Sequence, residues 1–205
     1  MSSSRKSTDQ GTYQPLTYFQ LMEVSLRELL VEKGIFTHEQ VNAAVEDMKQ
    51  RTPERGARVV AKAWVDDGFK QRLLKNGTAA CEELGLDIPA LKLVVVENTP
   101  QVHNAIVCTL CSCYPRVLLG IPPDWYKSRN YRSRMVREPR VVLEEGFGLK
   151  ISDAVQIRVH DSTADMRYLV MPMRPQGTEG WDEARLASLV TRDCMIGVAI
   201  PAAPR

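Results

Sequence analysis

Residues 107–115 read Val107-Cys108-Thr109-Leu110-Cys111-Ser112-Cys113-Tyr114-Pro115, and they hold three of the five cysteines of the chain within six consecutive positions. An apolar run, residues 103–107, leads into this segment, and Pro115, whose φ is fixed by its ring, ends it. The pattern predicts a β-strand that delivers a tight, thiol-rich loop. We interpret the rest of the chain as the scaffold around that loop.

Composition and charge narrow the class of protein. The chain has 205 residues, of which 44% are hydrophobic and 25% charged, as expected of a soluble globular protein with one core, alone or with an extension. A net charge of +2 gives no general reason to expect nucleic acid or an anionic membrane as partner. No apolar run approaches the roughly 20 residues that span a bilayer, and the polar N-terminus lacks a signal-peptide pattern, so we expect a cytoplasmic protein. In that compartment clustered cysteines bind metals or act in catalysis more often than they form disulfides.

The N-terminal part predicts a helical extension. Residues 1–16 are polar and predict a flexible tail. Thr17 with Gln20, and Thr37 with Gln40, have the capping-box spacing, and each pair precedes an apolar stripe of helical period. We therefore expect residues 1–55 to form a flexible tail and a helical hairpin. Such a hairpin either packs back on its own core or grips a partner subunit; the pattern does not decide between the two, and we favour the partner.

Residues 56–205 predict a mixed catalytic domain. Helical periodicity covers residues 57–64 and 69–74, and Thr78 is a candidate N-cap of a short helix that contains Cys81. Further segments are assigned by pattern: strands at 91–96, 104–107, 155–160, 166–171 and 195–200, and helices at 123–126, 139–145 and 182–190. The expected fold class is α+β, with the helical extension followed by a layered α-β-β-α core that carries the cysteine loop.

The spacing of the three cysteines leaves several kinds of site open. Structural zinc and iron–sulfur clusters need four protein ligands, whereas C-x-x-C-x-C supplies three, so a remote Cys81, Cys194 or histidine would have to complete the set. A disulfide inside so short a loop would be strained. Alternatively, the three sulfurs and the backbone nitrogens of Ser112 and Cys113 form a basket of five ligands around a trivalent metal, with one position open for a Lewis-acid reaction.

The segment at 107–115 resembles the metal claw of the nitrile hydratase α subunit. The resemblance extends over roughly residues 57–200. It is carried, besides the claw, by the segments Gly120–Lys127, Tyr131–Arg140, Arg167–Pro172, Arg174–Trp181 and Ile196–Val198.

The resemblance implies a ligand set and a cofactor. Cys108, Cys111 and Cys113 would bind the metal through sulfur, and Ser112 and Cys113 through backbone nitrogen. Cys111 would be oxidised to cysteine sulfinic acid and Cys113 to cysteine sulfenic acid. A threonine at position 109 goes with cobalt in this family, so the resemblance implies one cobalt(III) per chain in preference to iron(III).

The resemblance also implies the reaction and the partners. The enzyme would be a metal-dependent hydro-lyase that hydrates a small-molecule nitrile to its amide, with Cys113, Cys111, Ser112 and Arg167 as the catalytic residues. The sulfenate oxygen of Cys113 would act as nucleophile or base, and cationic groups, Arg167 among them, would stabilise it. The partners would be a β subunit in an αβ or higher hetero-oligomer and an activator or metallochaperone protein that inserts the metal.

Two alternatives remain beside this hypothesis. Arg116 follows Tyr-Pro where the nitrile hydratases often have tryptophan, and in this it is similar to the γ subunit of cobalt-containing thiocyanate hydrolase. The other alternative is a non-catalytic structural zinc or iron–sulfur module. The basic run at 129–140 is interpreted as an interface or a framework around the site and not as a nucleic-acid surface, because no recognised binding module accompanies it.

Overall fold

The computed structural model describes residues 15–88 and 91–202. The first elements are α1 (Tyr18–Glu32) and α2 (His38–Gln50). The others, in chain order, are α3 (Pro53–Val65), α4 (Asp67–Lys75), α5 (Gly77–Glu82), β1 (Lys92–Glu97), β2 (Val102–Val107), α6 (Arg116–Leu119), α7 (Asp124–Lys127), α8 (Arg129–Met135), α9 (Pro139–Val141), a π-helical turn (Val142–Gly146), β3 (Gln156–Asp161), β4 (Met166–Met171), α10 (Glu183–Ala187) and α11 (Arg192–Ile196). The contacts divide the chain into two compact units between residues 47 and 48.

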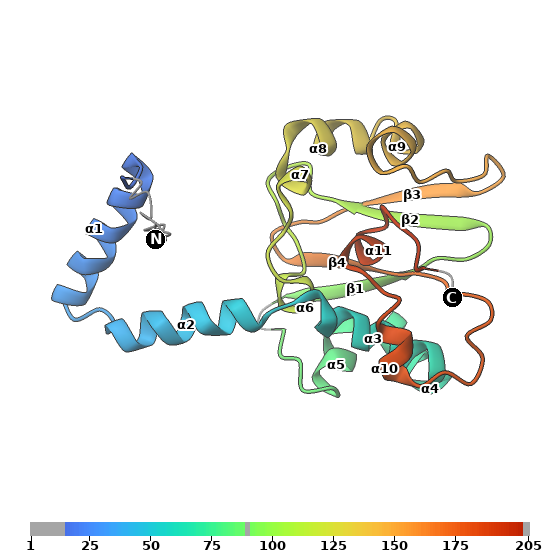
Figure 1. Cartoon of the computed structure of the whole chain (residues 1–205), viewed down its shortest axis with the longest axis horizontal. Helices are drawn as coiled ribbons and strands as arrows, with labels where there is room; N and C mark the ends of the chain where they lie inside the picture. Colours follow the sequence, from blue (N-terminus) through green and yellow to red (C-terminus); the bar gives the residue numbers. More distant parts are fainter. Residues whose placement is uncertain (1–14, 89–90, 203–205) are drawn as a thin grey trace, which may run out of the picture. The chain divides into compact units, whose positions relative to one another are not determined.

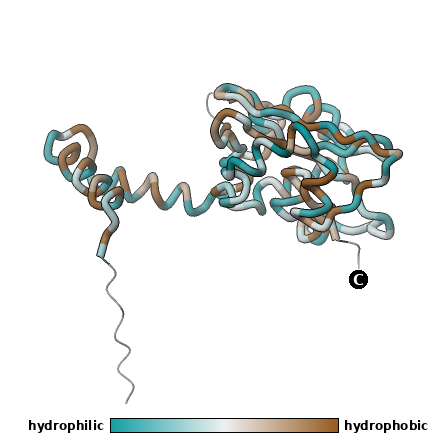
Figure 2. The backbone as a smooth tube through the Cα atoms, turned by 90° about the horizontal axis from the view of Figure 1, so that it is seen from above, coloured by the Kyte–Doolittle hydropathy of each residue, from teal (hydrophilic) through white to brown (hydrophobic). Residues whose placement is uncertain are grey.

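The two predicted N-terminal helices are confirmed, and so are their capping boxes. The Thr17 hydroxyl accepts from the backbone N–H of Gln20 at 3.4 Å, while the Gln20 side chain accepts from the Thr17 N–H at 2.8 Å. Thr37 and Gln40 make the same reciprocal pair. Apolar segments recur along both helices between polar ones (Figure 2). The predicted flexible tail falls largely on residues 1–14, which lie outside the described residues, and the predicted domain boundary at 55 stays a prediction.

The unit of residues 48–205 has the expected layered α+β architecture. Strand β1 pairs in parallel with β4, and β2 pairs in parallel with β3, so the core contains two small sheets. The sheets touch through β2 and β4, with α4 and α5 against β1 and α9 against β3. Figure 1 shows these layers in order, from α8 and α9 through β2–β3 and β1–β4 to α3, α4 and α5.

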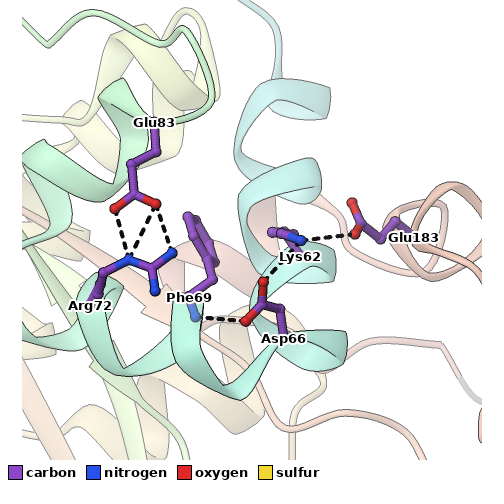
Figure 3. A network of polar contacts seen from close by, with 6 residues as sticks. All are labelled: Lys62, Asp66, Phe69, Arg72, Glu83 and Glu183. Carbon is purple, nitrogen blue, oxygen red and sulfur yellow. Dashed lines mark hydrogen bonds and ion pairs between the residues drawn. The ribbon is translucent and has the colours of Figure 1, made fainter.

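Helix α3 illustrates why the lower helical layer forms. Pro53 occupies its first turn, where a missing N–H costs nothing, and its residues Val59, Val60 and Ala61 are fully buried. The outer faces of α3, α4, α5 and α10 are joined by ion pairs: Lys62 with Asp66 and Glu183, and Arg72 with Glu83 (Figure 3). Asp66 also accepts from the Phe69 N–H at 2.8 Å and so begins α4 as its N-cap (Figure 3).

A buried polar network ties β2 to its neighbours. His103 donates from Nε2 to the carbonyl oxygen of Gly197 at 2.8 Å, since a carbonyl can only accept. Asn104 receives a hydrogen bond from Nε2 of His160 in β3 at 2.8 Å and donates to the carbonyl of Glu97 at 2.7 Å. Because burial lowers the pKa of His103 and of His160, both imidazoles are neutral near pH 7.

Four strand predictions are confirmed within two residues at each end, but the fifth is wrong. Residues 192–196 are helix α11, which Thr191 caps by accepting from the Cys194 N–H, and the chain then turns at Gly197 with φ +89. A short buried helix and a short buried strand have the same apolar composition, so only the cap and the left-handed glycine distinguish them. The N-cap of α5 is Asn76 and not Thr78. The Thr78 hydroxyl instead accepts a hydrogen bond from the Leu93 N–H at the edge of β1, at 2.9 Å.

Within residues 15–88 and 91–202, no helix combines the length and the apolar character that crossing a bilayer requires.

Candidate metal centre

Strands β2 and β3 fix the position of the cysteine loop. They end together, with Val107 opposite Asp161 in the register, and the Ser162 N–H extends the pairing by donating to the Val107 carbonyl at 2.8 Å. Cys108 follows Val107 directly and is fully buried. The loop of residues 108–113, called here the claw loop, therefore starts from a rigid point of the core.

The claw loop brings three thiols together. The Sγ atoms of Cys108 and Cys111 are 3.5 Å apart, and those of Cys111 and Cys113 are 3.2 Å apart. All three lie within 4.8 Å of one another, with Cys108 buried, Cys113 partly buried and Cys111 exposed. The Cys111 N–H also points to the Cys108 sulfur at 3.2 Å, which shows how closely the backbone wraps the cluster. Three soft donors converging in this way fit a transition metal ion.

Asp161 holds the second residue of the claw loop. Its carboxylate accepts from the Thr109 N–H at 2.9 Å and from the Thr109 hydroxyl at 2.5 Å. From the other side, the guanidinium of Arg132 donates to the Thr109 carbonyl at 3.3 Å. Sequence reasoning missed both contacts. Asp161 directly follows the strand predicted at 155–160, but only the pairing of β2 with β3 places it next to the claw loop.

An aromatic cluster supports the other end of the loop. The hydroxyl of Tyr126 donates to the Cys113 carbonyl at 2.9 Å, and that of Tyr131 to the Ile106 carbonyl at 2.7 Å. Tyr126 packs edge-on against Tyr114 and against Trp125. Both tyrosine hydroxyls are buried, and burial raises their pKa, so both stay protonated and act as donors.

The thiols differ in acidity. Hydrogen bonds from Cys113, then from the backbone of Ser112 and from Cys108, lower the pKa of Cys111 to about 7. Burial first, then the neighbouring thiols, raise the pKa of Cys113 to about 12, against which the charge of Arg167 acts in the opposite direction. A metal binds the thiolate, so the direction of the shift at Cys111 favours the form of this sulfur that binds metal.

The claw loop opens on a cavity of about 390 Å³. Its wall includes Cys111, Ser112 and Cys113 together with Arg116 and Arg167. Arg167 stands in β4, and its Nη1 donates to the carbonyls of Thr163, Ala164 and Met166, which fixes the guanidinium beside the loop. The structure thus brings together at one cavity Cys111, Ser112, Cys113 and Arg167, the four residues for which the resemblance implies a catalytic role.

The remaining cysteines do not join the cluster. Cys81 in α5 and Cys194 in α11 are buried, and burial raises the pKa of each thiol. Across the described part of the chain, Cys108, Cys111 and Cys113 form the one group of three or more metal-ligating side chains. A fourth thiolate or imidazole, as a structural zinc or iron–sulfur site would need, is not among its members.

Comparison with known proteins identifies the family. The model of the family described as nitrile hydratase, alpha chain, matches residues 17–199. The chain belongs to this family. The nitrile hydratase α subunit of a Rhodococcus species is 51% identical to it over 176 residues, which are 85% of this chain and 88% of that protein. The cobalt-containing nitrile hydratase α subunit of Pseudonocardia thermophila is 49% identical, covering 85% of this chain and 86% of that one.

Two further matches bear on metal and substrate. The thiocyanate hydrolase γ subunit of Thiobacillus thioparus is 45% identical, over 89% of this chain and 80% of that protein. The structure of an iron-type nitrile hydratase double mutant from Comamonas testosteroni Ni1 has a TM-score of 0.86 and 46% identity, with 91% of this chain and 94% of that chain covered. The nitrile hydratase family and the relation to thiocyanate hydrolase are therefore both confirmed, while relatives and structural neighbours include cobalt and iron types.

Proposed function

We propose that this chain is the catalytic α subunit of a nitrile hydratase, a hydro-lyase that converts a nitrile to the corresponding amide. One observation carries the proposal: the sulfur atoms of three cysteines lie within 4.8 Å of one another, and two of these cysteines, Cys111 and Cys113, line a cavity of about 390 Å³. A cavity of this volume is large enough for a small organic substrate. The family match and the cobalt-containing relatives support it.

The donor set fits a trivalent metal. Cys108, Cys111 and Cys113 would bind it through sulfur and Ser112 and Cys113 through backbone nitrogen, and we propose one cobalt(III) per chain in preference to iron(III). The bound ion would supply Lewis acidity toward the cyano group or toward water. Thr109 and the cobalt-containing relatives support cobalt, whereas the iron-type structural neighbour keeps iron as the competing assignment.

Side chains of the claw loop and Arg167 supply the rest of the proposed chemistry. We propose that an oxygen-donating oxidant, dioxygen or a peroxide, oxidises Cys111 to the sulfinic and Cys113 to the sulfenic acid; the oxidant is reduced and supplies the added oxygen atoms. The sulfenate oxygen of Cys113 then takes the proton of the water that attacks the cyano carbon, or attacks that carbon itself and is displaced from it by water. In both cases the elements of water add across the triple bond and the sulfenate is restored. Arg167, whose positive charge acts on Cys113, stabilises the anionic form of the oxidised sulfur.

Partners complete the assignment. We propose that the extension of residues 1–55 grips a β subunit, that residues 56–205 form the catalytic domain, and that an activator protein inserts the metal. The exposed apolar side chains of α1, including Leu26 at 57% exposure, support a partner contact. The five unpaired cysteines are consistent with a reducing, cytoplasmic location.

Metal analysis combined with turnover tests the proposal. The chain assembled with its β subunit should contain about one cobalt per chain and convert a simple nitrile to its amide. Mass spectrometry of the peptide spanning residues 108–113 should show added oxygens. Zinc in place of cobalt, unmodified cysteines and no amide would overturn the assignment in favour of a structural module.

Thiocyanate hydrolysis is a second candidate because of Arg116. Its side chain is exposed and lines the cavity beside the claw loop, where a cation would attract a small anion. The thiocyanate hydrolase γ relative at 45% identity supports the same choice. Thiocyanate consumption without amide production from nitriles would select this function.

A further inference from the structure

The charge lining the claw cavity is of one sign. Its wall contains three arginines, Arg51, Arg116 and Arg167, but no aspartate or glutamate among the described residues. Low-dielectric walls that carry one sign of charge concentrate ligands of the opposite sign. The arginines therefore make the electrostatic potential of the cavity positive, except where negative charge on the claw loop neutralises it.

Arg167 and Arg116 stand in different surroundings. Arg167 donates to three backbone carbonyls and acts electrostatically on Cys113, so its charge is directed at the claw loop. Arg116 begins α6, is exposed, and has no carboxylate ion pair within the described part of the chain. An exposed guanidinium without an ion pair to a carboxylate can bind a carboxylate or a similar planar anion of a ligand through two parallel hydrogen bonds.

The rest of the wall is apolar. Ile88, Leu91, Leu93 and Val117 line the cavity together with the claw loop and the arginines. A ligand that fits these walls has a hydrocarbon body, with the reacting group at the thiols and an anionic group at Arg116. Water or a very small neutral nitrile would use neither the apolar wall nor the cation.

We propose that the preferred substrates are nitriles that carry a carboxylate at the end of a hydrocarbon or aromatic body, and that Arg116 binds this carboxylate. The inference rests on the proposed nitrile hydration and adds the substrate class. The carboxylate takes no part in the reaction: water adds across the carbon–nitrogen triple bond, and the anionic group only orients the molecule. Arg116 is thus a specificity-determining residue.

A matched pair of substrates tests the proposal on the metal-loaded complex of this chain with its β subunit. 4-Cyanobenzoate and 4-cyanobenzamide have nearly the same shape and differ in charge. We expect kcat/KM to be about tenfold higher for the anion, the order expected of one charge-assisted contact. Added salt should reduce this preference, since it screens exposed charges.

Substitutions of Arg116 locate the effect. Arg116→Gln should lower kcat/KM for 4-cyanobenzoate about tenfold, mainly through KM, and leave 4-cyanobenzamide within about twofold. Arg116→Lys should restore part of the preference, because it keeps the charge without the planar fork. Arg58→Gln, which removes an exposed arginine of α3 outside the cavity wall, is the matched control and should change kcat/KM for neither substrate.

The outcomes separate the inference from the function on which it rests. Equal hydration of both nitriles, or an equal loss for both in Arg116→Gln with an altered metal absorption spectrum, would overturn the inference and leave nitrile hydration standing. The second result would assign Arg116 to the claw. Formation of neither amide would overturn the proposed function and the inference with it.

Discussion

Helices α1 and α3 both carry apolar residues at helical spacing, but they bury them very differently. Six residues of α3 are buried, whereas none of those in α1, Tyr18–Glu32, or in α2, His38–Gln50, is buried within this chain. Leu26 and Leu29 of α1 are 57% and 45% exposed. Within its own unit, α3 packs its apolar side against α6 and α10.

This difference assigns separate tasks to the two regions. Exposed apolar side chains in helices stabilised by capping boxes are typical of a surface that another chain covers. The unit of residues 48–205 has its own core, and the claw loop begins directly after strand β2 of that core. Assembly and metal binding should therefore respond to different substitutions, and the following experiments test that separation.

The largest effect is expected from the loss of a claw thiol. Cys108→Ala removes the fully buried sulfur and should reduce the metal content of the chain from about one ion to nearly none, with loss of turnover. Metal analysis and the nitrile assay measure both. Assembly with the β subunit should persist, and Cys81→Ala, which removes a buried thiol outside the cluster, should retain the metal. Retention of cobalt in Cys108→Ala would exclude this cysteine as a ligand.

The converse experiment places charge on α1. Because a fully buried leucine contributes about 1.5–3 kcal/mol, Leu26→Asp with Leu29→Asp should weaken association with the β subunit by about 100-fold or more. Titration followed by light scattering measures it, with Glu32→Lys as a control for a changed charge on the same helix. The melting temperature of the isolated chain should hardly change, because neither leucine is buried. Unchanged assembly would assign the partner contact to another surface.

The same division explains how much the sequence could predict. Local signals predicted the capped helices α1 and α2 and the strands β1 to β4, because hydrophobic period and cap residues act over a few positions. The cluster of thiols was also predicted, since Cys108, Cys111 and Cys113 are neighbours in the chain. Helix α11 was misassigned because its five residues are too few to distinguish a helical period from a strand.

Contacts between residues far apart in the chain could not be predicted from such local patterns. Asp161 lies 52 residues from Thr109, and Tyr126 lies 13 residues from Cys113, so neither spacing indicates a contact. The pairing of β2 with β3 and the packing of α7 with α8 create both. Arg167 was identified only through the family resemblance, and the fold then brings β4 to the cavity wall.

Substitutions of Tyr126 and Tyr131 distinguish effects on the stability of the core from effects on the claw loop. Each hydroxyl donates to one backbone carbonyl, and loss of the donor from a buried pair costs about 1–3 kcal/mol. Tyr126→Phe and Tyr131→Phe should therefore lower the free energy of unfolding by similar amounts in denaturant titrations. Only Tyr126→Phe, which frees the Cys113 carbonyl, should also slow metal incorporation. Equal incorporation rates in the two variants would show that this hydrogen bond does not shape the claw loop.

Asp161 provides the smallest and most local test, because its contacts with Thr109 are exposed to solvent. An amide at this position can accept one hydrogen bond but turns its own N–H groups toward the loop, so Asp161→Asn should cost about 1 kcal/mol of unfolding free energy. The loop would then sample more conformations before it binds metal, and incorporation at limiting cobalt should fall by a few-fold. Asp153→Asn is the matched control, since Asp153 is exposed and contacts Arg140 away from the claw. If both variants load cobalt at the wild-type rate, the claw loop is held without the contacts of Asp161. A selective defect in Asp161→Asn would mean that the end of β3 organises the loop before the metal arrives.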